Sequence, residues 1–342
     1  MGDAPAVSII IVNWNGSAYL RDCLDSLKRQ RYRDFEIILV DNGSEDGSVE
    51  LVRTHYRDFV RLIVLPRNRG FAGGNNVGIR QARGRYVALL NNDTEAHPAW
   101  LANLVECVDE DADVGMVGSK VLNFYRRDEI DNTGHLMYPD GLNRGRGRLE
   151  KDTGQYDEQR EILFPSGCAA LYSRKMLKEM GGFDESFFAY GDDADIGLHG
   201  RFLGYGAVFC PQAVVYHRYS GTAGRYSAMK AFHVERNRVW ILIKYFPFFQ
   251  IAVSPFYTLR RLALQGYGVL ARRGAAGAFA GNTTPADVIK TVLHAYAGAL
   301  LGVPEMLRKR RDIHRKMRVN AGEIRELLGR HSISCREIAW KD

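Results

Sequence analysis

The stretch Val7–Asn13 reads VSIIIVN, and Phe35–Val40 reads FEIILV. Continuous β-branched and aliphatic runs of this length are typical of strands that are buried on both faces of a parallel sheet. Between them, Tyr19–Arg29 repeats apolar residues with the 3.6-residue period of a helix that covers a sheet. This alternation predicts an α/β fold, in which a mostly parallel sheet is covered by helices.

The same alternation continues along the chain. We expect further strands at Val60–Leu65, Tyr86–Leu90, Gly115–Val121, Cys168–Ser173, Ala207–Cys210 and Val214–His217. We expect further helices at Ser48–Thr54, Asn75–Ala82, Pro98–Val108, Arg174–Met180 and Ala228–Tyr245. The segment Arg126–Gln159 breaks this rhythm, and we expect it to form long loops or a hairpin over one face of the sheet, as a candidate lid.

Charge divides the chain into two parts. Of the 342 residues, 46% are hydrophobic and 25% are charged, which is an ordinary globular composition. Residues 1–224 carry a net charge of −6, whereas residues 225–342 carry +13. We therefore expect one α/β domain in residues 1–224 and a basic helical region in residues 225–342. The five cysteines are widely spaced without a CxxC pair, which favours a reducing compartment over a disulfide framework or a zinc–thiolate site.

The basic region has a pattern of its own. Prolines interrupt its apolar segments, which are too short for a spanning helix of about 20 apolar residues. Arginine pairs, Arg260–Arg261 and Arg272–Arg273, flank them. This pattern favours helices that lie in the interface of an anionic membrane; a small helical domain with a solvated basic face and a homodimerisation module are alternatives. Nucleic acid is not an expected partner, because zinc spacing and an RNP-type strand are lacking. No signal-peptide pattern precedes Val7, so we expect a cytoplasmic protein on the inner face of the cytoplasmic membrane.

Polar side chains follow four of the predicted strands at the point where each strand ends. They are Asn13–Trp14, Asp41, the segment NRGFAGGNN at Asn68–Asn76, and Asn92–Asp93. Turn chemistry alone often places such residues there. The carboxyl ends of parallel strands, however, meet at one edge of a sheet, which is where ligands bind. Four such ends predict a binding crevice.

The first three strand ends carry groups that suit a nucleotide. Asp41 can accept hydrogen bonds from a ribose or a nucleobase, with an Asx cap of the next helix as its alternative role. The glycines after the third strand permit close backbone approach, and N–H groups at a helix start suit a diphosphate. Neither GxGxxG nor GxxxxGK[ST] occurs, so a dinucleotide-binding fold and a P-loop NTPase are not supported.

Asp93 follows the buried strand YVALL, with the amide of Asn92 beside it. A carboxylate at such an edge suits a hard divalent cation that is shared with phosphate oxygens. His217 ends a later strand and is a candidate second ligand, although a lone histidine is more often structural. Carboxylate and imidazole together fit Mg²⁺ or Mn²⁺ better than zinc.

Two adjacent acids, Asp192 and Asp193, open a helical pattern directly after Gly191. The helix dipole favours the charged form of an acid at this position. Such a carboxylate is a good general base for a substrate hydroxyl. Capping of the helix is the alternative role.

Taken together, these motifs resemble glycosyltransferase family 2, the inverting enzymes of GT-A fold. VSIIIVNWNGSAYLRDCLDSL, followed by ILVDNGSEDGS, is similar to the nucleotide-binding start of that family. LNNDTE stands in the place of its DxD motif, and GDDAD stands in the place of its acidic motif after the lead-in FDESFFAY. The resemblance covers about residues 5–225, and the order and spacing of the motifs agree with the family.

The resemblance implies a metal-dependent transferase that uses a nucleotide-diphosphate sugar. Asp193 matches the catalytic base, and Asp192 replaces the usual Glu beside it. Asp93 keeps the last acid of DxD, and Asn91 stands in place of the first, so His217 becomes more important as a ligand of Mg²⁺ or Mn²⁺. Further donor contacts are expected from Val12, Trp14 and Asp41 at the base and ribose, and from Asn68, Gly73 and Asn76 on the diphosphate side, with Asn92 beside Asp93.

The segment NRGFAGGNN and the basic helical tail are similar to the bacterial rhamnosyltransferase-like branch of that family. That branch builds O-antigen and other cell-surface glycans on polyprenyl-diphosphate carriers. The resemblance implies dTDP-L-rhamnose as donor and a hydroxyl of a lipid-linked saccharide as acceptor. A UDP-sugar-dependent transferase and a non-catalytic scaffold that binds sugar nucleotides are the alternatives.

Overall fold

The computed structural model describes residues 4–109, 113–218, 227–270 and 285–340. The strands are β1 (Val7–Asn13), β2 (Phe35–Asp41), β3 (Arg61–Val64), β4 (Tyr86–Leu90), β5 (Thr94–Ala96), β6 (Val114–Asn123), β7 (Ile130–Asn132), β8 (His135–Met137), β9 (Asn143–Gly145), β10 (Ala169–Ser173) and β11 (Gly206–His217). The helices of the first 217 residues are α1 (Ser17–Lys28), α2 (Ser48–His55), α3 (Gly70–Gln81), α4 (Trp100–Asp109), α5 (Arg174–Met180), the 3₁₀ turn η1 (Glu185–Phe187) and α6 (Asp192–Phe202). The C-terminal helices are α7 (Ala228–Tyr245), α8 (Phe248–Leu270), α10 (Pro285–Leu301), α11 (Val303–Lys316), α12 (Ala321–Arg330) and α13 (Cys335–Trp340).

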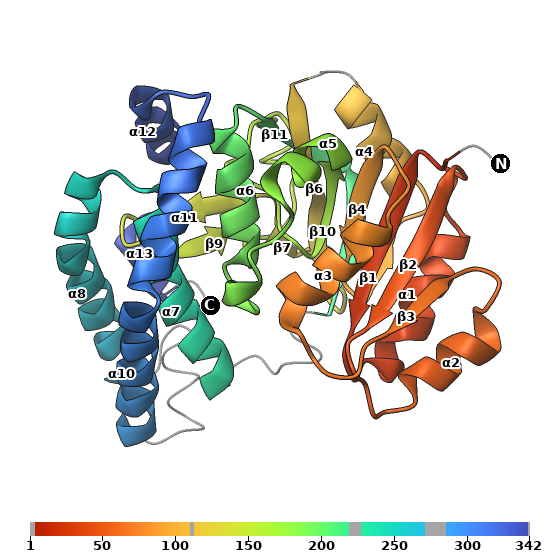
Figure 1. Ribbon diagram of the computed structural model, residues 1–342, viewed down its shortest axis with the longest axis horizontal. Helices are drawn as coiled ribbons and strands as arrows, with labels where there is room; N and C mark the ends of the chain where they lie inside the picture. The colour runs from red at the N-terminus through yellow and green to blue at the C-terminus, as the bar shows by residue number, and fades with distance from the viewer. Residues whose placement is uncertain (1–3, 110–112, 219–226, 271–284, 341–342) are drawn as a thin grey trace.

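One mixed sheet forms the centre of the molecule (Figure 1). Its strand order is β3-β2-β1-β4-β10-β6-β11-β5, and β7 pairs with β6. The strands β3, β2, β1 and β4 are mutually parallel, whereas β10 runs antiparallel between β4 and β6. The register sets Asn13 of β1 opposite Asp41 of β2, so the carboxyl ends of these strands are level. The predicted α/β sheet covered by helices is confirmed.

Most elements of the first 180 residues lie close to where the sequence predicts them, but the glycine-rich segment differs. Helix α3 begins at Gly70, five residues before the predicted start at Asn75. A Cβ atom at Gly74 would come within 2.6 Å of Val12, and one at Gly78 within 2.5 Å of Ile10. These glycines therefore let α3 pack closely on β1 rather than forming an extended loop.

Two other segments refine the predictions. The short strands expected at Ala207–Cys210 and Val214–His217 are one strand, β11, whose pairing with β6 shifts register between Cys210 and Val214. A β-bulge of this kind bends a strand without ending it. The segment Arg126–Gln159 contains the predicted hairpin, formed by β8 and β9.

The C-terminal helices stand against one end of the sheet domain (Figure 1). A shared hydrophobic cluster joins them to α6; its buried members include Leu198, Phe202, Trp240, Tyr245 and Ile313. The predicted boundary between residues 224 and 225, like the Arg272–Arg273 pair, lies outside the described residues. Within the described part of the chain, no single helix has the length and hydropathy needed to cross a bilayer; the bent pair Ala286–Leu301 and Val303–Lys316, at 54°, meets the criterion jointly.

Candidate active site

A chain of hydrogen bonds joins the ends of three parallel strands. The Asn92 side-chain amide donates to Asn13 Oδ1 at 2.7 Å, and Asn13 Nδ2 donates to Asp41 Oδ2 at 3.0 Å. Asp41 Oδ1 also accepts the backbone N–H of Ser44 at 2.9 Å. All three of the linked side chains, Asn13, Asp41 and Asn92, are buried. The sequence did not single out Asn13 as a ligand contact, and here it ties the predicted donor residues Asp41 and Asn92 together.

The third strand end is tied to the second through Asn42. Its amide donates to Asn68 Oδ1 at 2.9 Å and to the Gly70 carbonyl at 3.0 Å. Asn68 Oδ1 in turn accepts the Gly70 N–H at 2.7 Å. Asn68 is half-buried at the start of α3, so its placement is set by the neighbouring strand end.

The other predicted donor residues lie on β1 and α3. Val12 and Trp14 are half-buried at the end of β1 and just beyond it. Gly73 and Asn76 are buried in α3. Asn76 bonds Phe183 in both directions, donating to its carbonyl at 2.9 Å and accepting its N–H at 2.8 Å. Asn76 thus fastens α3 to the segment that leads into α6.

Asp93 and His217 are brought together, as the sequence predicts. His217 Nε2 lies 3.3 Å from Asp93 Oδ1, and His217 Nδ1 lies 2.7 Å from Asp131 Oδ2. Arg148 pairs with the other oxygen of Asp131 at 2.9 Å. Burial alone would lower the pKa of His217, but the surrounding carboxylates and Cys168 raise it well above its usual value.

The cluster has one feature that is typical of a site for a divalent cation, a carboxylate behind the histidine. A carboxylate behind a histidine fixes its tautomer and directs the other ring nitrogen toward a metal. Asp131 has this position relative to His217, whose Nε2 faces Asp93. Among the described residues, no group of three or more His, Cys, Asp or Glu side chains is arranged to hold a metal ion. Further ligands for a cation would therefore have to come from outside these side chains, as phosphate oxygens do.

The two acids at the start of α6 differ in their environments. Burial, followed by repulsion from Asp193, raises the pKa of Asp192 well above its usual value. For Asp193 burial also acts to raise the pKa, but His135 and the N–H groups of Ala194 and Gly167 outweigh it and lower the pKa. The two carboxyl groups therefore have pKa values that are shifted in opposite directions, and the partner with the lowered pKa is the better suited to accept a proton.

His135 is the neighbour that the sequence did not identify. Its Nε2 lies 3.3 Å from Asp193 Oδ2 and 3.1 Å from Asn132 Nδ2. Its ring stacks on Phe164 with 4.9 Å between centroids. The orientation of the imidazole is therefore fixed on one face by packing and at one nitrogen by polar contacts.

The acid pair and the Asp93–His217 cluster flank one dipeptide. The Gly167 N–H bonds Asp193, and the thiol of the next residue, Cys168, bonds His217. The short segment from Asp131 to His135 likewise touches both centres, because Asp131 contacts His217 and His135 contacts Asp193. A small hollow of about 30 Å³ opens beside His217. The acid pair and the Asp93–His217 cluster, which the sequence predicts as the general base and the cation site, are thus assembled at one place.

The segment before the acid pair has a strained backbone that a C-terminal helix holds. Phe188 and Tyr190 adopt left-handed φ angles of 65° and 63°. The buried Asn237 of α7 donates its side-chain amide to the carbonyls of Phe187 at 3.0 Å, Ala189 at 2.9 Å and Tyr190 at 2.5 Å. Residues in such conformations persist only where the surroundings over-determine them. The position of the acid pair therefore depends on α7.

Comparison with known sequences agrees with this reading. Residues 8–181 match the sequence profile of glycosyl transferase family 2. The chain is 31% identical over 244 residues to an uncharacterized protein of Sinorhizobium fredii, covering 66% of this chain and 26% of that one. It is 28% identical over 219 residues to an uncharacterized glycosyltransferase of Rickettsia typhi (62% and 63%) and 29% identical over 228 residues to the O-antigen biosynthesis protein RfbC of Myxococcus xanthus (64% and 18%). The chain thus spans less than two thirds of the length of these relatives.

Solved structures share the fold. The mannosyltransferase PcManGT from Pyrobaculum calidifontis, in complex with GDP-Man and Mn²⁺, superposes with a TM-score of 0.51 at 19% identity, over 96% of this chain and 80% of that one. GalNAc-T7 with UDP, GalNAc and Mn²⁺ superposes with a TM-score of 0.60 at 16% identity, over 91% and 55%. At these identities the likeness concerns the fold alone, and the predicted GT-A fold is confirmed.

Proposed function

Because this chain belongs to glycosyl transferase family 2, we propose that it moves a sugar, with inversion, from a nucleotide-diphosphate sugar to a hydroxyl of a saccharide acceptor. The observation that carries the proposal is the placement of the acid Asp193, whose pKa is lowered, beside the Asp93–His217 cluster at the carboxyl edge of the sheet. Ligands of open α/β sheets bind at that edge.

In this proposal Asp193 takes the proton of the acceptor hydroxyl as its oxygen attacks the anomeric carbon. The contact with His135 keeps the carboxylate ionised and oriented, so His135 acts as a positioning residue. The raised pKa of Asp192 favours its neutral form, in which it would not oppose the negative charge of the base and could donate a hydrogen bond.

On the donor side, Asp41 binds the base or ribose, with Val12 and Trp14 near the ring. Asn68, Gly73 and Asn76 line the diphosphate side, and Asn92 supports Asp93. Asp93 and His217 hold Mg²⁺ or Mn²⁺, and Asp131 sets the direction of the His217 ring. When bound, such a cation neutralises charge on the leaving diphosphate. The Mn²⁺ of the two structural relatives supports this assignment.

The donor is proposed to be dTDP-L-rhamnose, with a UDP-sugar as the alternative. The acceptor is proposed to be a saccharide on a polyprenyl diphosphate during assembly of a cell-surface polysaccharide, at the inner face of the cytoplasmic membrane. The similarity to an O-antigen biosynthesis protein supports this class of pathway.

A thermal-shift panel tests donor binding. The purified protein is heated with dTDP-rhamnose, UDP-glucose, UDP-galactose, UDP-GlcNAc or GDP-mannose, each with and without Mn²⁺. A ligand of the native state raises its midpoint by mass action. We expect one donor to give a shift that depends on Mn²⁺; a full set of donors without any shift would contradict the proposal.

The Asp193→Asn variant then tests the chemistry. It should keep donor binding and lose transfer by about 10²- to 10⁴-fold, the usual contribution of a general base. Asp192→Asn is the matched comparison, because it makes the same substitution at the neighbouring acid, leaves the proposed base in place and should lose much less activity. Turnover by Asp193→Asn at the wild-type rate would exclude Asp193 as the base, and donor binding without any transfer by the wild type would favour the non-catalytic scaffold.

A further inference from the structure

Helix α8 has its polarity reversed relative to a helix of a water-soluble surface. The residues that it turns toward the protein include Ser254, Thr258 and Arg261, which are buried. The residues that it turns outward include Phe249 and Phe256, whose side chains are 79% and 67% exposed. A surface helix ordinarily buries its apolar stripe and exposes its polar one.

The reversal is fixed by ion pairs rather than by loose packing. Arg261 is fully buried, and its Nε donates to Asp140 Oδ2 at 2.7 Å. Its two terminal nitrogens donate to the carboxylate of Glu235 at 2.7 and 2.9 Å. Turning α8 around would leave two buried carboxylates without this partner, which is strongly unfavourable. These ion pairs keep the polar face of α8 directed inward, so its apolar face stays directed outward.

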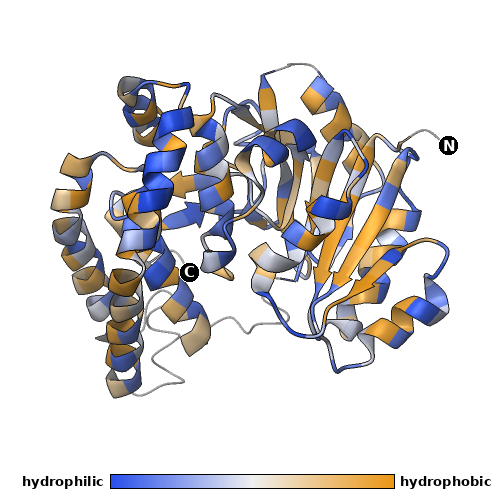
Figure 2. Cartoon of the chain, viewed as in Figure 1, coloured by the Kyte–Doolittle hydropathy of each residue, from blue (hydrophilic) through white to orange (hydrophobic). Residues whose placement is uncertain are grey.

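Helix α10 shows the same distribution. The side chains that it packs inward are small: Ala295 and Ala299 are buried. Large aliphatic side chains point outward along its length, namely Ile289, Leu293, Leu300 and Leu301, which are 59% to 85% exposed. Figure 2 shows hydrophobic residues along both α8 and α10, which form the outer edge of the molecule. Isolated exposed apolar residues are normal, but several large ones on two helices at the same side of the molecule favour an interaction surface.

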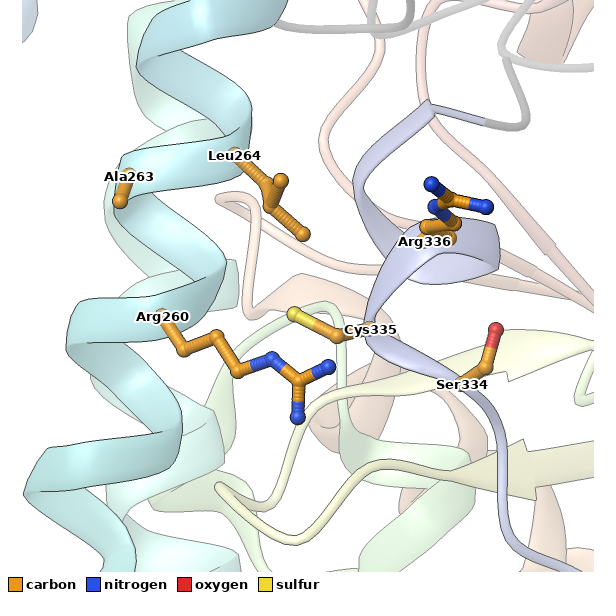
Figure 3. A pocket seen from close by; sticks show the side chains of 6 residues that line it. All are labelled: Arg260, Ala263, Leu264, Ser334, Cys335 and Arg336. Carbon is orange, nitrogen blue, oxygen red and sulfur yellow. The ribbon is translucent and has the colours of Figure 1, made fainter.

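Basic groups lie at this apolar surface. Arg260, Lys290 and Arg308 are exposed on α8, α10 and α11. A hollow of about 380 Å³ beside α8 is lined by Arg260 and by Arg336 of α13 (Figure 3). Across residues 4–109, 113–218, 227–270 and 285–340, no carboxylate pairs with either of these two arginines. Arg336 also lies over the ring of Trp340, 5.8 Å from its centroid. Two guanidinium groups without a carboxylate partner among the described residues, next to exposed aromatic and aliphatic side chains, match an anionic headgroup above acyl chains.

We propose that the outward faces of α8 and α10 form a docking surface that enters the interface of an anionic lipid bilayer. A second copy of this chain is disfavoured as the occupant, because residues 225–342 carry a net charge of +13 and two such faces would repel. The inference deepens the proposed function, since it names the surface that would bring the active site to a lipid-linked acceptor.

Vesicle flotation of the full chain tests this proposal without donor or acceptor. Vesicles of phosphatidylcholine alone are compared with vesicles of phosphatidylcholine and phosphatidylglycerol in about equal parts. We expect the protein to float with the anionic vesicles, to float less with the neutral ones, and to detach as salt is raised. Protein that stays at the bottom with anionic vesicles would overturn the proposal.

Two variants locate the surface. Phe249→Ser with Phe256→Ser removes two exposed aromatic side chains and should lower the partition coefficient at least tenfold. Val64→Ser removes an exposed apolar residue from β3, which is 46% exposed, and should float like the wild type. Two results would overturn the lipid assignment. One is a double variant that floats as the wild type does; the other is a wild type that is a dimer in solution while the double variant is a monomer. The donor thermal shift, measured on the same samples, distinguishes loss of this surface from failure of the proposed transferase.

Discussion

Replacing Asn237 by Ala should slow sugar transfer although this residue belongs to α7, outside the strands that build the site. Asn237 is fully buried, and its amide bonds three carbonyls in the segment before Asp192 and Asp193. The variant removes these bonds and leaves the helix that carries them intact, since alanine favours helix.

The expected loss of rate follows from two opposing contributions, the backbone strain of the segment and the hydrogen bonds that hold it. Phe188 and Tyr190 have positive φ angles, and Phe188 combines its φ of 65° with a ψ of −64°; such sparsely populated conformations cost about 1–3 kcal/mol each, or about 2–6 kcal/mol together. Hydrogen bonds contribute about 1 kcal/mol net each, so the Asn237 amide supplies about 2–3 kcal/mol to hold the segment. Because the two sums are comparable, the segment relaxes once the amide is gone. A displacement of the acid pair by about 1 Å would lower the rate of transfer by about 10²-fold.

The assay measures kcat and the donor KM separately. We expect kcat to fall by about 10²-fold and the donor KM to stay close to the wild-type value, because the donor residues lie on other elements. Met229→Ala, an exposed position on the same helix, is the control and should leave both constants unchanged. A variant that loses thermal stability yet keeps kcat within twofold would refute the positioning role of Asn237.

Three further predictions concern the polar clusters. His135→Gln should move the acidic limb of the kcat/KM profile to higher pH, because His135 lowers the pKa of the base; His135→Arg, which keeps a positive charge, should restore part of the shift, and an unmoved profile would contradict the role. Asp131→Asn should weaken the Mn²⁺ dependence of donor binding about 10- to 100-fold, because it withdraws the partner that directs His217, and titration of Mn²⁺ in the thermal-shift assay checks this. Arg261→Met should lower the free energy of unfolding by about 3 kcal/mol at neutral pH, measured by urea denaturation. Burial would raise the pKa of Glu235, but Arg261 and Arg238 together lower it from 4.5 to about 2, which corresponds to about 3 kcal/mol. That stabilisation is complete above about pH 4.5 and is lost as the pH falls toward 2. The difference in free energy of unfolding between variant and wild type should therefore become smaller as the pH falls across this window.

The parallel strands and the carboxylates at their ends were predictable because both are local signals. A run such as VSIIIVN is buried on both faces whatever surrounds it, and its end must lie at the ligand edge of a parallel sheet. The contact between Asp93 and His217 followed from the same argument, since both residues end strands of one sheet.

The partners of these residues were not predictable, because they come from distant segments. Asp131 lies 86 residues from His217, in a region whose sequence lacks periodicity, and Asn237 lies 50 residues from Phe187. The reversed polarity of α8 was hidden for a related reason. Its sequence shows an amphipathic pattern, but the face that points inward is decided by Glu235 and Asp140 from other elements.

The hydrophobic cluster that α6 shares with α7 and α11 limits how the C-terminal helices could be exchanged between related proteins during evolution. A targeting tail joined through a linker can be exchanged between proteins as a cassette, leaving the enzyme to which it was attached unchanged. Here an exchange would uncover Leu198 and Phe202 on α6, the helix that begins with the proposed acid pair. Chimeras joined at residue 225 should therefore be insoluble unless the face of α6 that packs against the C-terminal helices is transferred with them. The proposed membrane surface and the proposed acceptor site would then be inherited as one unit.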